Sequence, residues 1–168
     1  SDNILREESS LDLLVNNAGI MIPPPSKTED GFEIQFGVNF VGHFALTGHL
    51  FNLLESTKDS RVVTLSSIAH RGAAIDFDNF RLEKEYNNWR EYGQSKLADI
   101  IFALEFDKRL KMNGNQIKSL AAHPGFSKTD LQKYMDKDML ASLELMTAKE
   151  GAQPTLAACL REDAKGGQ

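Results

Sequence analysis

The segment EYGQSK, residues 91–96, places a tyrosine and a lysine four positions apart, and these two side chains could share one reaction. In a helix, residues i and i+4 lie on the same face, so Tyr92 and Lys96 could reach one bound oxygen atom. A phenol has a pKa of about 10, too high for efficient proton transfer at neutral pH, and a neighbouring ammonium lowers it. The spacing therefore indicates acid–base chemistry at Tyr92 that Lys96 assists. The alternative is an ordinary amphipathic helix start.

The rest of the chain alternates between strand and helix patterns. Short apolar runs, typical of strands buried on both faces, occupy residues 11–15, 62–65 and 117–122. Helical patterns cover residues 28–56, 91–112 and 148–162. We expect Thr28 to cap the first helix, and we expect the second to bury a stripe formed by Leu97, Ile101, Leu104 and Leu110. This alternation predicts an α/β domain with a parallel sheet and helices on both faces.

The composition is that of one globular domain with no sign of a nucleic-acid or membrane surface. The chain has 168 residues, 41% of them apolar, and a net charge of −5 without any run of basic residues. Cys159 is its single cysteine, and the four histidines show no metal-ligand spacing with it, so we expect no disulfide framework and no metal. No apolar stretch reaches the roughly 18–20 residues that cross a bilayer. We therefore expect no membrane segment and a cytoplasmic location.

Small polar residues follow each apolar run, at the edge where open parallel sheets bind ligands. They are Asn16 to Gly19, then Ser66 and Ser67, then His123 to Gly125. Any one of these groups would fit an ordinary turn, but all of them together with Tyr92 predict a binding site. The hydroxyl of Ser67 could hold a carbonyl or alcohol oxygen against Tyr92, whereas Ser66 should point the other way across the strand.

Asn39 is an unusual residue in the middle of the first helical pattern. Asparagine competes with the backbone for hydrogen bonds, so a buried asparagine there needs a partner. Its neighbours Val38, Phe40 and Val41 are apolar, which favours burial over simple surface exposure. We interpret Asn39 as marking a local break in the helix, whose freed backbone carbonyl would hold a water molecule near Lys96.

Taken in order, these motifs resemble the short-chain dehydrogenase/reductase family. They are NNAG after a strand, an asparagine in the next helix, Ser-Ser ending a strand, YGQSK opening a helix, and HPGFSKT. The segments SSIAHRG, FDNFRLEKEYNNWREYGQSKLA and AHPGFSKTDL are similar to the retinol-dehydrogenase-like branch, which also resembles the WW-domain oxidoreductases. The resemblance covers nearly all of the chain. It implies a Rossmann-like doubly wound sheet and an NAD(P)-dependent oxidoreductase that interconverts an alcohol and a carbonyl by hydride transfer (EC 1.1.1.-).

The resemblance also implies a role for particular residues. Tyr92 would exchange a proton with the substrate oxygen, Lys96 would lower the tyrosine pKa and hold the nicotinamide ribose, Ser67 would orient the carbonyl, and Asn39 would hold the relay water. The expected cofactor contacts are Asn17, Ala18, Gly19, Tyr92, Lys96, Pro124, Gly125, Ser127 and Thr129. The segment 130–146, with Met135, Met139 and Met146, would cover a small apolar substrate, although its methionines could equally be simple packing.

The Gly-rich turn with which the family holds the cofactor pyrophosphate has no match in this chain. We therefore interpret residues 1–168 as a single domain that forms the C-terminal larger part of the fold and is incomplete at its N-terminus. The resemblance implies NADP or NAD as the cofactor, with NADP slightly favoured, and it allows a homodimer. Besides an oxidoreductase, two readings stay open: a non-catalytic fragment or binding module, and a sugar-nucleotide epimerase.

Overall fold

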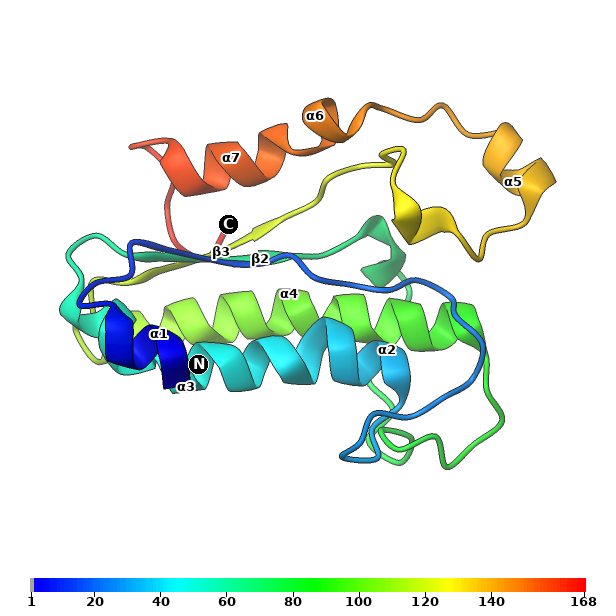
Figure 1. Cartoon of the computed structure of the whole chain (residues 1–168), viewed down its shortest axis with the longest axis horizontal. Helices are drawn as coiled ribbons and strands as arrows, with labels where there is room; N and C mark the ends of the chain where they lie inside the picture. Colours follow the sequence, from blue (N-terminus) through cyan, green and yellow to red (C-terminus); the bar gives the residue numbers. More distant parts are fainter. Residues whose placement is uncertain (1) are drawn as a thin grey trace.

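The computed structural model describes residues 2–168, which form a parallel sheet between two layers of helices (Figure 1). The strands are β1 (Leu13–Asn16), β2 (Arg61–Leu65) and β3 (Lys118–Ala122), in the order β1-β2-β3. In this register Val63 lies beside Val15 on one side and Leu120 on the other. The predicted α/β fold with a parallel sheet is confirmed, and all these strands end at one edge of the sheet.

Helices cover both faces of the sheet, as expected from the sequence. Figure 1 shows α3 and α4 beneath the sheet and α7 above it. The α-helices are α1 (Asp2–Glu7), α2 (Ile34–Phe36), α3 (Gly42–Ser56), α4 (Asn88–Met112), α5 (Lys137–Ala141), α6 (Ala148–Gly151) and α7 (Gln153–Leu160). The other helical segments are the π-helix η1 (Gly37–Val41) and the 3-10 helices η2 (Ile68–His70) and η3 (Asp130–Gln132).

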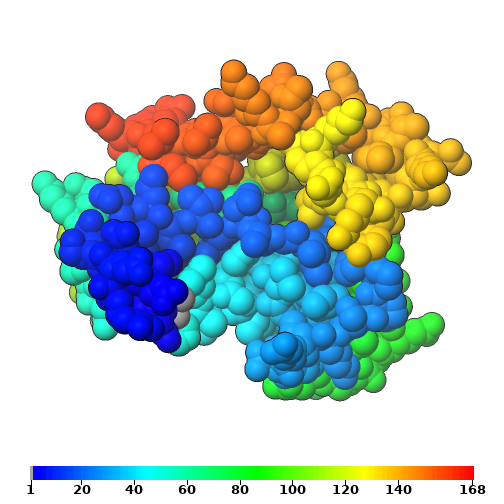
Figure 2. Space-filling view, in the orientation of Figure 1, coloured from blue at the N-terminus to red at the C-terminus, as the bar shows by residue number. Residues whose placement is uncertain are grey.

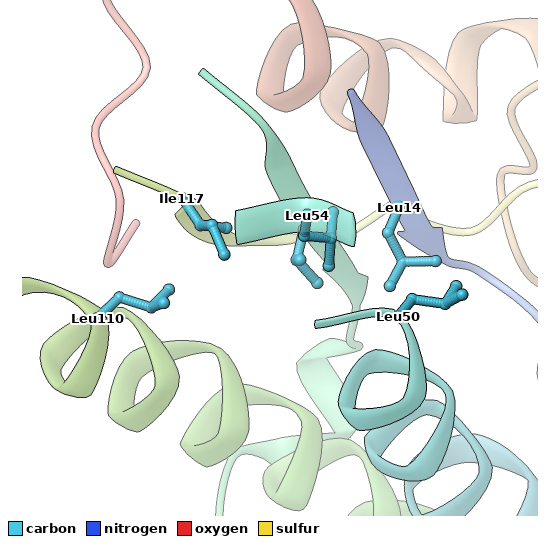
Figure 3. Close-up of a cluster of buried hydrophobic side chains, with 6 residues drawn as sticks. Leu14, Leu50, Leu54, Leu110 and Ile117 are labelled. Carbon is cyan, nitrogen blue, oxygen red and sulfur yellow. The ribbon is translucent and has the colours of Figure 1, made fainter. Parts of the chain in front are cut away.

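Apolar side chains fill the space on each side of the sheet. Between the sheet and helices α3 and α4, the buried cluster consists of Leu14, Leu50, Leu54, Val62, Leu110 and Ile117 (Figure 3). On the opposite face, Val63, Leu65, Leu120 and Ala122 pack with Cys159 of α7. Since β2 contributes to both clusters, burial on each face fixes where α4 and α7 lie against the strand that carries Ser66 and Ser67 at its end.

The first predicted helix begins six residues later than expected. Thr28 does not cap it, because Thr28 forms a turn in which the Gly31 N–H donates to the Thr28 carbonyl at 2.9 Å. The cap is Glu33, whose carboxylate accepts hydrogen bonds from the backbone N–H groups of Gln35 and Phe36 at 3.0 and 2.7 Å. A carboxylate at this position satisfies two of the free N–H groups that every helix start leaves.

The predicted apolar stripe of α4 is wrong for two of its residues. Ile101 and Leu104 are each 47% exposed, whereas Leu110 is buried as expected. The buried face instead carries small and polar residues, among them Ser95, Ala98 and Ala103. This face packs against several elements, since α4 contacts β2, β3, η1 and η2. Close packing of small side chains carries no strong apolar periodicity, which explains the error.

The remaining boundaries differ in smaller ways. The helix expected over residues 148–162 is divided into α6 and α7 at Ala152, and Pro154 lies in the first turn of α7, where a missing N–H costs nothing. At the chain end, the Gly167 N–H donates to the Ser119 carbonyl at 2.8 Å, and the Ala121 N–H donates to the Gln168 carbonyl at 2.7 Å. The last residues therefore extend the hydrogen bonding beside β3.

Leu54 is the residue whose removal should most directly weaken this core. It is 0% exposed and lies in the cluster between α3 and the sheet (Figure 3). We expect Leu54→Ala to lower the free energy of unfolding by about 2–5 kcal/mol, because the lost contacts leave a cavity. Urea denaturation would measure the change, with Leu160→Ala, at a position 65% exposed, as the control. Equal effects of the two substitutions would contradict the assigned core.

Candidate active site

A cavity of about 710 Å³ lies at the carboxyl edge of the sheet. Figure 2 shows the surface hollowed where the segment after β1, in blue, faces the segment after β3, in yellow. Of the residues singled out in the sequence, those that line it are Asn17, Ala18, Gly19, Ser66, Ser67, Tyr92, Lys96, His123, Pro124, Gly125, Ser127 and Thr129. Asn39 is not in the cavity wall. The topology thus brings together residues that are far apart in the sequence.

Two hydrogen bonds join α4 to the end of β2 and fix the position of Tyr92 and Lys96 along the strand end. The Ser66 hydroxyl donates to the Lys96 carbonyl at 2.7 Å, and the Lys96 ammonium donates to the Leu65 carbonyl at 3.0 Å. Ser66 and Ser67 both border the cavity, but they have different partners. The Ser66 hydroxyl is bound to the backbone of α4, whereas the Ser67 side chain is hydrogen-bonded with Tyr92.

Tyr92 is nearly buried, and its pKa is raised rather than lowered. Burial is the largest cause, because it disfavours the phenolate; a hydrogen bond with the Ser67 side chain lowers the pKa, and the charge of Asp99 raises it. The expected lowering by Lys96 is therefore not present in this structure. The Lys96 ammonium lies 2.9 Å from Asp99 Oδ2, whose charge raises the Tyr92 pKa.

Asn39 lies in the π-helix η1, within the break that its position predicted. The Gly42 N–H donates to the Gly37 carbonyl, five residues back, instead of the usual four. The Asn39 side chain is fully buried, so surface exposure is excluded. Its Oδ1 accepts from the Ile20 N–H at 2.8 Å, and its Nδ2 donates to the Ile20 carbonyl at 3.0 Å. Asn39 thus fixes the backbone that follows NNAG; a relay water at its carbonyl stays a prediction.

The loop from Pro124 to Thr129 is held by contacts that the sequence did not reveal. Gln132 is buried, and its amide nitrogen Nε2 donates to the Ser127 carbonyl at 2.7 Å. The Ser127 hydroxyl donates to the Pro124 carbonyl at 3.0 Å. Gly151 of α6 packs so closely on this loop that a Cβ there would collide with the Ser127 hydroxyl. The loop is therefore fixed by η3 on one side and α6 on the other.

An apolar wall stands beside the tyrosine. Met21, Ile22, Tyr92 and Met135 form one buried cluster. Of the three methionines expected to cover the substrate, only Met135 is in this cluster; Met139 and Met146 are 44% and 38% exposed. The backbone of Met146 instead pairs with the loop after β3, because its N–H donates to the Phe126 carbonyl at 2.8 Å.

A buried polar network holds this wall in place, and sequence reasoning missed it. Ile22 has a φ of +46°, a strained conformation for a β-branched residue. Its N–H donates to Gln35 Oε1 at 2.8 Å, and Gln35 Nε2 donates to the Tyr86 hydroxyl at 3.1 Å. The Tyr86 hydroxyl donates to the Pro23 carbonyl at 2.6 Å, and burial raises the pKa of Tyr86 to about 12. The long segment before α4 therefore supports the cavity wall.

Within residues 2–168, no three or more His, Cys, Asp or Glu side chains are grouped so that they could hold a metal ion. Over the same residues, no helix has the length and apolarity that a membrane span requires.

Comparison with protein families decides the classification. Residues 1–140 match the family model described as short chain dehydrogenase. The chain belongs to the short-chain dehydrogenase family. Among curated proteins, it is 45% identical over 132 residues to human retinol dehydrogenase 13, covering 78% of this chain and 39% of that protein. It is 40% identical over 166 residues to human retinol dehydrogenase 12, covering 96% of this chain and 52% of that protein. The chain thus spans about half the length of the curated relatives or less.

Solved structures share the fold. An uncharacterized protein from Mycobacterium paratuberculosis superposes with a TM-score of 0.79 at 38% identity, over 98% of this chain and 55% of that one. The RhlG/NADP active-site complex of Pseudomonas aeruginosa superposes with a TM-score of 0.72 at 22% identity, over 99% of this chain and 66% of that one. The Rossmann-like architecture of this short-chain dehydrogenase is confirmed by these neighbours.

His43, which sequence reasoning did not assign, should make the stability depend on pH. It is buried, and burial first and Lys96 second lower its pKa, outweighing a smaller opposite effect of the Asn39 backbone. Below a pH of about 6.5 the unfolded chain takes up a proton that the folded chain refuses, so stability falls as pH falls, by up to about 1.4 kcal/mol per pH unit. We expect His43→Leu to reduce this loss.

The measurement is urea denaturation between pH 7.5 and 5 in steps of about half a unit, over the range where histidine titrates. His49→Leu, on the exposed side of the same helix, is the matched control and should keep the slope of the unsubstituted chain. Identical slopes for His43→Leu and the unsubstituted chain would show that His43 is not held neutral.

Proposed function

We propose that this chain carries the catalytic residues and the nicotinamide-binding surface of an NAD(P)-dependent oxidoreductase that interconverts an apolar alcohol and its carbonyl compound. The observation that carries the proposal is the convergence of Tyr92, Ser67 and Lys96 on one cavity. Membership of the short-chain dehydrogenase family supports it. The cavity volume, about 710 Å³, is within the range of small-molecule sites.

The cavity wall fits a nicotinamide cofactor by its donor groups. The ammonium of Lys96 and the hydroxyl of Tyr92 would hold the nicotinamide ribose, and the loop from Pro124 to Thr129 would contact the carboxamide. Asn17, Ala18 and Gly19 would pass beneath the adenosine side, and Gly19 lies so close to Asn39 that a Cβ there would stand 3.3 Å from Asn39 Oδ1. When bound, the cofactor supplies or accepts the hydride.

Tyr92 would transfer the proton to or from the substrate oxygen, and Ser67 would orient that oxygen. In reduction the Tyr92 hydroxyl would donate its proton, and the raised pKa keeps that proton in place at neutral pH. In oxidation the same oxygen would have to accept a proton, which higher pH favours. The Ser67 side chain, hydrogen-bonded with Tyr92, would orient the substrate oxygen beside it.

An apolar substrate suits the wall next to Tyr92. Met21 and Leu131 line the cavity with Tyr92 and belong to the same apolar cluster. The names of the curated relatives support a retinol-like alcohol, since retinol dehydrogenases 12 and 13 are 40% and 45% identical to this chain. Retinaldehyde is therefore the first carbonyl substrate to assay.

Tyr92→Phe should lower turnover sharply and weaken cofactor binding less than Lys96→Ala does, because the lysine would still hold the ribose. The substitution removes the acidic proton but keeps the ring and its packing, and proton transfer of this kind contributes about 10²–10⁴-fold to the rate. Reduction of retinaldehyde with NADPH would measure turnover, and quenching of Trp89 fluorescence would measure binding. Turnover equal to that of the unsubstituted chain would remove Tyr92 from the proposed mechanism.

Lys96→Ala should weaken NADPH binding as well as turnover, because the ammonium would hold the ribose. Fluorescence titration with NADPH and NADH, on this chain and on a form extended at its N-terminus, would measure both affinity and cofactor choice. Lys111→Ala is the control, since Lys111 pairs with Asp107 at the far end of the same helix. Binding that Lys96→Ala leaves unchanged would exclude contact with the ribose, and no binding to either form would favour a non-catalytic module.

A further inference from the structure

Asp99 is a buried carboxylate next to the catalytic lysine, and neither the sequence motifs nor the mechanism above uses it. It lies one turn after Lys96 on α4 and is 0% exposed. Its Oδ2 lies 2.9 Å from Lys96 Nζ. Its Oδ1 is buried and has no hydrogen-bond partner among the described residues. Only one of the two carboxylate oxygens therefore has a partner that offsets its loss of water.

A half-compensated buried carboxylate is a poor source of stability. Removing a charge from water costs several kcal/mol, and a buried ion pair recovers this only when further hydrogen bonds satisfy both partners. Burial accordingly raises the pKa of Asp99 to about 7, although Lys96 lowers it. The presence of Asp99 is therefore better explained by its effect on the position and charge balance of Lys96 than by a contribution to folding stability.

The charged and titratable groups around the pair come from two helices. Tyr92 lies one turn before Lys96 on α4, and the charge of Asp99 raises its pKa. From α3, His43 faces Lys96, and its pKa is lowered by burial and by the Lys96 charge, so it is neutral near pH 7. From the end of β2, the Leu65 carbonyl accepts from Lys96 at 3.0 Å. The Lys96 ammonium is thus held between Asp99 and the strand end.

We propose that Asp99 is a positioning residue that anchors the Lys96 ammonium at the end of β2 and balances its charge toward Tyr92. This inference rests on the proposed function, because it assigns Asp99 a part in setting the acidity of the tyrosine. When Asp99 is ionised, it opposes the effect of Lys96, and Tyr92 keeps its proton. When Asp99 is neutral, the charge of Lys96 acts on the phenol without opposition, and the hydroxyl becomes more acidic.

Asp99→Asn tests the inference in the ligand-free chain. We expect the Tyr92 pKa to fall by about one unit or more, because a nearby negative charge is removed and the lysine charge is left unbalanced. NMR of chains with ¹³C-labelled tyrosine rings would follow the titration of Tyr92, with Tyr92→Phe used to identify its signal. An unchanged Tyr92 pKa in Asp99→Asn would overturn the inference.

Asp107→Asn is the matched control. Asp107 is a buried carboxylate two turns further along α4, and it is ion-paired with Lys111 at 2.6 Å. The Asp107→Asn substitution should leave the Tyr92 pKa unchanged, because the Asp107 charge is far from the cavity. An equal fall in both variants would assign the effect to general loss of packing in α4 and would overturn the inference.

A measurement on the unsubstituted chain covers the case in which Asp99→Asn does not fold. NMR of ¹³C-labelled aspartate carboxyls and lysine side chains should show Asp99 titrating near neutral pH, with the Lys96 signals shifting at the same midpoint. Lys96 signals that do not respond to the titration of Asp99 would overturn the inference. None of these readouts requires turnover, so an inactive chain would contradict the proposed function and leave this test intact.

Discussion

The attachment of α4 to the end of β2 is the interaction on which the candidate site depends. The Ser66 hydroxyl binds the Lys96 carbonyl, and the Lys96 ammonium binds the Leu65 carbonyl, so helix and strand exchange hydrogen bonds in both directions. The helix also contacts β3, so it is held along more than one strand of the sheet. Tyr92, one turn away on the same face, is brought over Ser67 as a consequence.

Buried polar groups do much of the remaining positioning, and apolar packing supplies the stability. Asn39 fixes the backbone at Ile20, and Gln35 fixes it at Ile22, so the segment after β1 is held from the interior by two side chains of adjacent helical turns. Each bond satisfies a backbone group that would otherwise be buried without a partner. The π-helix turns Asn39 inward, where it also donates to Ser95 Oγ on α4 at 3.0 Å. This links the two helices beneath the cavity.

The α/β fold and the groups at the strand ends that line the cavity were predictable from local patterns, whereas Ser127 and Thr129 were expected from the family resemblance. Apolar runs that end in NNAG, Ser-Ser and HPG identify strand ends, and parallel strands end at one edge. Helix starts were less predictable. Thr28 has the residue type of a cap, but tertiary contacts of the following segment select Glu33 instead, whose N–H donates to the Phe80 carbonyl at 2.8 Å.

Electrostatic effects and supporting contacts could not be predicted from spacing alone. The prediction that Lys96 lowers the Tyr92 pKa failed because it considered the pair in isolation from burial and from Asp99. Gln35, Gln132 and His43 were missed since they lie among ordinary helical or loop residues and are brought to the site only by the fold. What distinguishes these three residues is that their polar side chains are buried. Burial is known only from the packed structure and not from the sequence.

The most direct test is a crystal structure of the NADPH complex, formed with whichever form of the chain binds the cofactor. We expect a nicotinamide ribose within hydrogen-bond distance of Tyr92 and Lys96, with the ring facing Ser67 and the carboxamide against the loop from Pro124 to Thr129. A nicotinamide bound outside this cavity, or a ribose that does not contact Lys96, would contradict this expectation.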